Sequence, residues 1–226
     1  MELNTIERFL LIAQHPSKGR YRISEVFVKY GTIGAILLEM TLSNKIKVEN
    51  NILLIEEDAE FQNPVLNEIA FIIKSSTKPR KIKYWIRKLS SKSNKFRWAF
   101  ANDLAIKRLI RIENKKFLGF IPYRLCYLEE PRISQALIEN AKQSILSNEE
   151  IAVENMMILG LIEACKMHKI ITSDKLELKT IKKELKQIIK ENPIASTVES
   201  TIREVQAAIM AAIIVSTVAT TSSSSH

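Results

Sequence analysis

The segment that most constrains the fold lies near the end of the sequence, where residues 194–219 place Ala, Ile and Val on nearly every face of a helix. A helix that is apolar all round must be covered on all sides by protein or by lipid. Its longest apolar run, AAIMAAIIV at 207–215, is well short of the roughly 20 residues that a bilayer span requires. We therefore predict a buried central helix that other helices surround.

Several other segments have the spacing of amphipathic helices. In PRKIKYWIRKLSS, apolar residues recur at i, i+3, i+4 and i+7, which is the pattern of one buried helix face. Gly31 and Gly34, three residues apart in another helical stretch, favour close helix packing. Asn63 and Pro64 have the residue types of an N-cap and a first helical position. The predicted helices cover residues 2–14, 23–42, 63–76, 79–91, 95–109, 132–146, 149–169 and 173–191.

Two similar stretches predict short β-hairpins. NKIKVEN (44–50) and RLIRIEN (108–114) share the pattern x-x-Ile-[Lys/Arg]-[Val/Ile]-Glu-Asn, and each follows a predicted helix. Helix, strand and hairpin in this order are also found in winged-helix modules, so a nucleic-acid-binding protein is one alternative.

The chain is long enough for one well-buried core, and five Gly and six Pro leave little room for an all-β design. The predicted fold class is mainly α. We expect a single globular domain over residues 1–220, with a central apolar helix ringed by amphipathic helices and short β-hairpins. Residues 221–226 are predicted to be a disordered tail.

The second predicted hairpin, within RIENKKFLGFIPYRL (111–125), has an apolar tip next to positive charge. Hairpin tips normally face water, so an apolar one points to a membrane, or to a partner protein or second copy of the chain. A wing that binds nucleic acid would instead carry Lys or Arg at its apex, which makes nucleic acid the weaker alternative. The residues predicted to enter the membrane or flank it are Lys115, Lys116, Phe117, Leu118, Phe120 and Ile121.

The net charge of +9 is concentrated in one part of the sequence. Residues 78–116 hold 14 Lys or Arg against two acidic residues, whereas the rest of the chain holds 20 basic and 23 acidic residues. A field concentrated in this way favours a polyanionic partner, such as an anionic membrane or a nucleic acid.

The sequence contains no pattern that predicts catalysis. It lacks the Gly-x-Ser-x-Gly, HExxH and Walker motifs. Cys165 and His168, three residues apart, supply only two of the four ligands that a structural metal site needs. Two cysteines without a framework fit a reducing compartment, and the N-terminal residues do not have a signal-peptide pattern. We expect no enzyme activity, no cofactor and no metal, in a cytoplasmic protein peripherally associated with membranes.

Five stretches, in this order, resemble the Golgi phosphoprotein 3 family: GTIGAILLEMTLSNKIKV, NPVLNEIAFII, KPRKIKYWIRKLS, DLAIKRLIRIENKKFLGFIPYRL and the Ala-rich terminal helix after REV. The resemblance covers residues 6–219. It is greatest to the compact bacterial members, which lack the Arg-rich N-terminal extension of eukaryotic ones.

The resemblance implies one helical domain with an exposed β-hairpin, which maps to about 113–124. Eukaryotic members are peripheral membrane proteins that recognise phosphatidylinositol 4-phosphate and insert the hairpin tip into the bilayer. They also bind the cytosolic tails of Golgi glycosyltransferases. By resemblance we expect a non-enzymatic adaptor for membrane enzymes that binds anionic, phosphoinositide-type lipid.

The resemblance also locates a lipid-headgroup site. The family's headgroup positions fall on Ser24, Ile33, Asn94 and Arg97, and Arg97 alone has the residue type of the family. Nearby basic residues extend the candidate set for a looser anionic site. The predicted headgroup-binding residues are Arg97, Lys92, Lys95 and Arg20.

Overall fold

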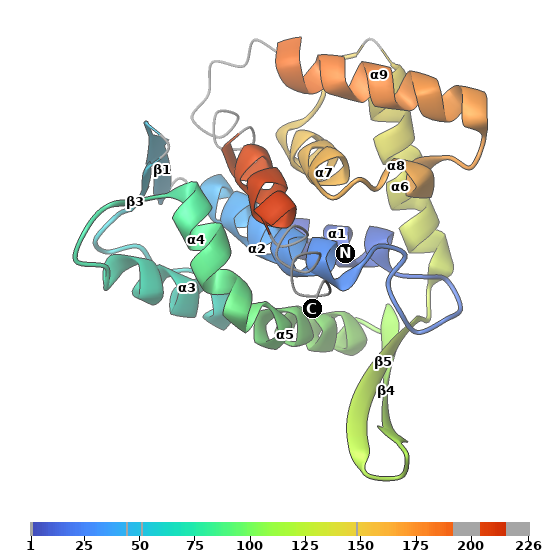
Figure 1. Ribbon diagram of the computed structural model, residues 1–226, viewed down its shortest axis with the longest axis horizontal. Coiled ribbons are helices and arrows are strands. Elements are labelled where there is room, and N and C mark those ends of the chain that lie inside the picture. Colours follow the sequence, from blue (N-terminus) through green and yellow to red (C-terminus); the bar gives the residue numbers. More distant parts are fainter. Residues whose placement is uncertain (1, 44, 51, 148, 192–203, 216–226) are drawn as a thin grey trace, which may run out of the picture.

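Helix α2 (Glu25–Leu42) lies in the middle of the protein, and other helices contact it from several sides (Figure 1). This computed structural model describes all residues except 1, 44, 51, 148, 192–203 and 216–226. Twelve of the 18 residues of α2 are buried, on all of its faces. Helices α1 (Thr5–Ala13), α4 (Ile82–Leu89), α5 (Ser93–Ile106) and α7 (Val153–Ala164) pack against it. The predicted mainly α fold is confirmed, and a buried, largely apolar helix lies at its centre.

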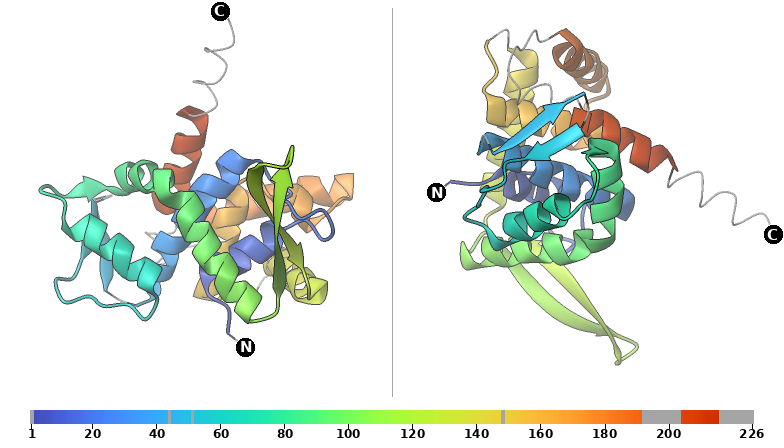
Figure 2. Two further views of the ribbon diagram at one scale, coloured as in Figure 1. Left: turned by 90° about the horizontal axis from the view of Figure 1, so that it is seen from below. Right: turned by 90° about the vertical axis from the view of Figure 1, so that its left-hand side faces the viewer.

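The remaining elements complete this arrangement. They are β1 (Ile46–Glu49), β2 (Ile52–Ile55), α3 (Pro64–Lys74), β3 (Arg80–Lys81), the short 3-10 helix η1 (Ser90–Lys92), β4 (Ile110–Phe117), β5 (Ile121–Leu128), α6 (Pro131–Leu146), α8 (His168–Ile171) and α9 (Lys175–Glu191). Residues 204–215 form a further helical segment. Figure 2 shows this segment at one side of the body, while the β4–β5 hairpin leaves it in another direction.

Two glycines of α2 allow close packing, as their spacing predicted. A Cβ atom on Gly31 would lie 2.4 Å from the Phe9 ring, and one on Gly34 would lie 2.2 Å from Ile209. Both distances are shorter than real Cβ contacts, so larger residues would push α1 and residues 204–215 away from α2. At α3 the predicted start is also confirmed, because the Asn63 side chain accepts a hydrogen bond from the Val65 N–H at 2.8 Å and Pro64 follows it.

The position of the central helix differs from the sequence prediction. Residues 204–215 bury one face, which includes Val205 and Ile209, but leave Met210, Ile214 and Val215 exposed. The segment is therefore peripheral, and α2 occupies the central place. The other residues of the predicted terminal helix, and the predicted tail at 221–226, lie outside the described residues.

Two local predictions also need correction. The single helix predicted over 149–169 is divided into α7 and α8, because Lys166 adopts a positive φ of 54° between them. The helix predicted over 79–91 begins only at Ile82, because the two residues before it form strand β3. These two residues pair with β2 (Ile52 with Lys81, Leu53 with Arg80), and a pair of residues is too short to show the alternation of a strand.

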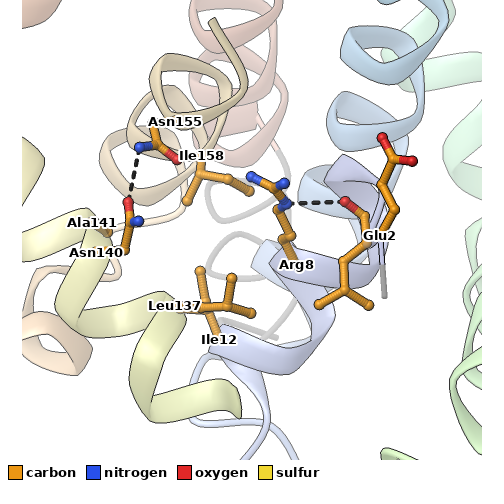
Figure 3. A pocket seen from close by; sticks show the side chains of 9 residues that line it. Glu2, Arg8, Ile12, Leu137, Asn140, Ala141, Asn155 and Ile158 are labelled. Carbon is orange, nitrogen blue, oxygen red and sulfur yellow. Dashed lines mark hydrogen bonds between the residues drawn. The ribbon is translucent and has the colours of Figure 1, made fainter. Parts of the chain in front are cut away.

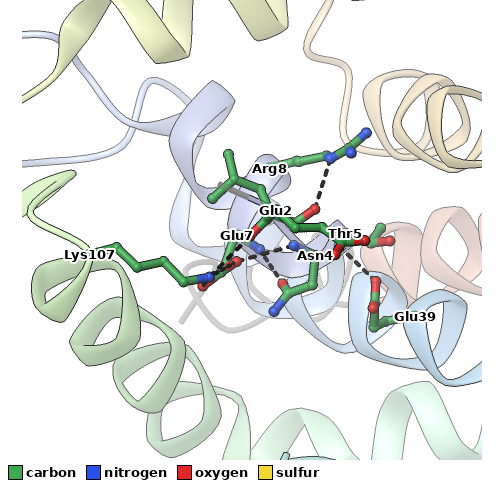
Figure 4. A network of polar contacts seen from close by, with 8 residues as sticks. Glu2, Asn4, Thr5, Glu7, Arg8, Glu39 and Lys107 are labelled. Atoms are coloured by element: carbon green, nitrogen blue, oxygen red, sulfur yellow. Dashed lines mark hydrogen bonds and ion pairs between the residues drawn. The ribbon is translucent and has the colours of Figure 1, made fainter.

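A buried carboxylate joins α1 to the end of α5, immediately before the β4–β5 hairpin (Figure 4). The Lys107 Nζ lies 2.6 and 2.7 Å from the two carboxylate oxygens of Glu7, which is 1% exposed. Glu7 also forms a capping box with Asn4 at the start of α1. After Lys107 the chain turns into β4 at Arg108, whose φ is 58°. The ion pair therefore fixes the point from which the hairpin leaves the body.

Candidate functional site

The β4–β5 hairpin is anchored in the body at one end and exposed at the other. Eight residues of each strand are paired, from Ile110 with Leu128 at the base to Phe117 with Ile121 at the tip. Ile110, Cys126 and Leu128 are buried at the base, and burial raises the pKa of the Cys126 thiol to about 12. The hairpin predicted at about 113–124 is confirmed, and its strands extend further at both ends.

The outer end of this hairpin exposes four neighbouring apolar side chains. Phe117 is 59% exposed, Leu118 70%, Phe120 71% and Ile121 45%. Figure 1 shows this end projecting well beyond the helices. These four residues form the apolar tip.

The turn of the hairpin holds a large side chain in an unfavourable backbone conformation. Leu118 has a φ of 52° and Gly119 a φ of 80°, and the Phe120 N–H donates to the Phe117 carbonyl at 3.3 Å. Three residues separate the paired Phe117 and Ile121, and the first two of them have positive φ. Asn or Gly normally occupies positions with this φ, as in type I′ turns. A leucine there costs about 1–2 kcal/mol, and its side chain is neither buried nor packed against the body.

Basic residues line the outer half of the hairpin below the tip. Lys115 lies 3.1 Å from Glu113, which also pairs with Arg111. Within the described part of the chain, no acidic side chain lies within ion-pair distance of Lys116. Lys116 therefore presents an uncompensated positive charge next to the apolar tip.

The predicted headgroup residues fall into two groups. Lys92 and Lys95 both face Glu68 of α3, at 3.4 and 2.6 Å. The hydrogen bond from Lys95 is the main cause of the lowered pKa of Glu68. These two lysines are thus paired with a carboxylate of the same chain.

Arg97 has a different environment. Its side chain is 13% exposed, donates to Glu25 and Asn94 at 2.8 Å each, and lies over the rings of Tyr21 and Trp98. Burial is also the main cause of the raised pKa of Tyr21. The Arg97 Nε is a buried donor with no hydrogen-bond partner among the described residues.

The loop that carries Arg20 lies against the base of the hairpin. The Cys126 N–H donates to the Gly19 carbonyl at 3.1 Å, and the His15 N–H donates to the Arg20 carbonyl at 2.9 Å. Tyr21 of the same loop contacts Arg97. The structure therefore brings Arg20 and Arg97 toward the base of the hairpin, while Lys92 and Lys95 point to α3.

The other two positions given by the resemblance have structural roles. Ser24 is the N-cap residue of α2, without a capping hydrogen bond from its side chain, and Ile33 is fully buried within the core. Ile33 is therefore inaccessible to a ligand in this structure.

The metal candidates Cys165 and His168 are both buried, and the His168 ring contacts Glu163. In the described part of the chain, no group of three potential metal-ligating residues comes together.

The sequence interpretation did not single out Arg124, which lies beside Trp98 and near Arg97. Its guanidinium lies 5.3 Å from the Trp98 ring, which Arg97 also contacts. Arg124 pairs with Asn114 across the hairpin, on the same face as Lys116. Alternation along the second strand would have shown that Arg124 and Pro122 share a face, but not that Trp98 lies beside it.

A family model described as Golgi phosphoprotein 3 (GPP34) matches residues 6–205. The chain belongs to the Golgi phosphoprotein 3 family. No match was found among curated proteins. Among the described residues, no helix of this family member is long and apolar enough to cross a membrane.

Proposed function

We propose that this protein binds peripherally to anionic membranes by inserting the apolar tip and placing basic residues against lipid headgroups. The observation that carries the proposal is the exposure of four neighbouring apolar side chains at the end of a projecting hairpin. A contiguous apolar surface of this kind normally marks a membrane or protein contact.

The apolar contribution is substantial but incomplete by itself. Full burial of a Phe or Leu side chain yields roughly 1.5–3 kcal/mol. Four residues that enter the lipid only in part supply about 5 kcal/mol on this scale. Lys115, Lys116 and Arg124 each add about 1 kcal/mol near an anionic surface, less at high salt. Neither signal holds a protein firmly alone, and the combination follows the logic of two-signal membrane anchors.

The leucine in the turn supports the same function. Asn or Gly at position 118 would satisfy the turn at lower conformational cost. A large apolar side chain kept there, exposed to water, fits a role in contact with lipid better than a role in stability.

We place the headgroup contact beside the hairpin base, where Arg97 and Arg20 approach the membrane-facing element. Arg97 has the residue type that the family uses for phosphatidylinositol 4-phosphate and an unsatisfied Nε donor. By analogy with the family, the membrane-bound protein then acts as a non-enzymatic adaptor for the cytosolic tails of membrane enzymes.

Liposome co-sedimentation tests the insertion. The double variant Phe117→Glu/Phe120→Glu should lose binding to phosphatidylserine-containing vesicles, because two carboxylates would have to enter the acyl region. The matched control is Phe71→Glu on α3, since Phe71 is 71% exposed like Phe120 but lies away from the hairpin. Phe71→Glu should bind like the wild type. If the double variant also binds like the wild type, hairpin insertion is wrong.

Two further measurements separate the alternatives. If the apolar tip is instead a dimer contact, light scattering will detect a wild-type dimer that the double variant converts to a monomer. If the basic residues bind nucleic acid, a gel shift with duplex DNA at low salt will persist in the double variant.

The headgroup contact needs its own test. Binding of the wild type and of Arg97→Gln should be compared on vesicles with and without phosphatidylinositol 4-phosphate.

A further inference from the structure

A second concave site lies away from the hairpin, where α1, α6 and α7 meet. This cavity of about 250 Å³ has an apolar floor that includes Ile12, Leu137 and Ile158 (Figure 3). Arg8 extends into it from α1, while Asn140 and Asn155 lie on the opposite wall. A concave pocket that combines apolar side chains with convergent polar groups is a usual form of a small-molecule site.

Arg8 has unused hydrogen-bonding capacity in this pocket. Its Nε donates to the Leu3 carbonyl at 3.0 Å, which leaves the four N–H groups on its two terminal nitrogens. Among the described residues, no carboxylate lies within ion-pair distance of Arg8. A half-buried guanidinium without an anionic partner favours a carboxylate ligand, which it binds through two parallel hydrogen bonds.

The two asparagines add further polar groups. The Asn155 Nδ2 donates to the Asn140 Oδ1 at 2.8 Å and to the Ser144 Oγ at 3.3 Å. This arrangement leaves the Asn140 Nδ2 as a donor and the Asn155 Oδ1 as an acceptor. The pocket therefore offers mainly donors to a ligand oxygen, above an apolar floor.

We propose that this pocket binds a small monocarboxylate with an apolar tail. At about 30 Å³ for each water molecule, the cavity has the room of roughly eight waters, which is enough for a carboxylate with a short alkyl chain. The carboxylate contacts Arg8, and the tail lies on Leu137 and Ile158. Glu2 also lines the pocket, and its carboxylate disfavours ligands that carry a second negative charge.

NMR titration of the labelled full chain with sodium hexanoate, which has the size of the cavity, tests this proposal. Hexanoate should shift the side-chain amide signals of Asn140 and Asn155 in a saturable way. Arg8→Gln should raise the Kd at least tenfold, and Leu137→Trp, which fills the pocket, should abolish the shifts. Glu2→Gln should lower the Kd by about 1.5- to 5-fold, because it removes a like charge at a solvent-exposed position.

Two controls make the outcome decisive. Arg132→Gln changes an exposed arginine of α6 outside the pocket lining and should leave the Kd unchanged. Hexanamide, which lacks the charge, should bind at least tenfold more weakly than hexanoate. Unchanged hexanoate affinity in Arg8→Gln, equal binding of hexanamide, or no saturable shift at the pocket residues would overturn the proposal. None of these results affects vesicle binding by the apolar tip.

Discussion

The two hairpins of this protein begin with the same sequence pattern and have opposite environments. The β1–β2 hairpin has four-residue strands, pairs with β3 and contacts α3. Ile46, Val48 and Leu53 are buried there, in alternation with exposed residues. The β4–β5 hairpin has eight-residue strands, of which only the base is buried.

The comparison indicates that strand length determines whether the apolar residues of each hairpin are buried or exposed. Four residues of a strand span about 13 Å, so the first hairpin stays beside the helices and its apolar residues join the core. Strands twice as long carry the second hairpin beyond the body, where no described helix covers its tip. The apolar residues of the first hairpin therefore stabilise the fold, whereas those of the second remain available for a partner.

The largest expected effect is on the free energy of unfolding, and it tests whether the apolar residues of the two hairpins differ in role. Leu53→Ala in the first hairpin should lower the free energy of unfolding by about 2–5 kcal/mol, because it leaves a cavity in the core. Phe120→Ala at the apolar tip should change it by less than about 0.5 kcal/mol. Urea denaturation measures both. A loss of several kcal/mol in Phe120→Ala would mean that the tip packs against the body in solution.

Substitutions at the turns of the two hairpins should change stability by a smaller amount, and in opposite directions. Asn50 and Leu118 have nearly the same positive φ, of 51° and 52°. Asn tolerates this region and Leu does not. Asn50→Leu should therefore destabilise the protein by about 1 kcal/mol, and Leu118→Asn should stabilise it by about 1 kcal/mol.

Leu118→Asn should at the same time weaken vesicle binding, because it removes an apolar side chain from the tip. Leu118→Ala is the control for this pair of effects, since it also removes the side chain but keeps a residue that disfavours positive φ. It should weaken binding without a gain in stability. If Leu118→Asn is no more stable than Leu118→Ala, the turn is not strained.

A lysine in each hairpin gives a third comparison. We expect removal of the charge near the apolar tip to cost about 1 kcal/mol of membrane-binding free energy. Lys116→Gln should weaken binding to anionic vesicles about fivefold and reduce its salt dependence. Lys47→Gln, in the first hairpin, should leave binding unchanged. Lys47 already lies 4.0 Å from Glu56, and its strand β1 lies far from the outer end of the β4–β5 hairpin (Figure 1). Equal losses in the two variants would indicate a general charge effect without a defined contact.

Sequence reasoning located the features that local patterns encode. Both hairpins, the start of α3 and the glycines that pack α2 follow from residues close together in the chain. The apolar tip was also predictable, because its four residues lie within five positions of one another. Its exposure required the structure, since exposure depends on how far the strands extend beyond the helices.

Features that depend on distant residues were not predictable in this way. Residues 204–215 have the composition of a central helix, but α2 occupies the centre because Gly31 and Gly34 admit neighbours closely on two sides. The predicted headgroup residues also separate into two groups, because they pair with acidic residues that are distant in the sequence. Glu68 lies 24 and 27 positions from the two lysines that it pairs with, and Glu25 lies 72 positions from Arg97.

The smallest expected effect concerns Glu68, which holds Lys92 and Lys95 beside α3. The lowered pKa of Glu68 means that its ion pairs stabilise the fold above its ordinary pKa of 4.5, and that this contribution is lost as the pH falls through the lowered value. Glu68→Gln should cost about 0.2–1 kcal/mol at pH 7, and the difference from the wild type should vanish in acid.

The same variant tests whether these lysines bind headgroups. Glu68→Gln releases both lysines from their only described acidic partner, so vesicle binding should strengthen if they face the membrane together with the apolar tip. Unchanged binding, with the expected small loss of stability, would assign Lys92 and Lys95 to the body of the protein. The headgroup contact would then belong to Arg97 and Arg20 at the hairpin base, and membrane binding would depend on one region of the molecule alone.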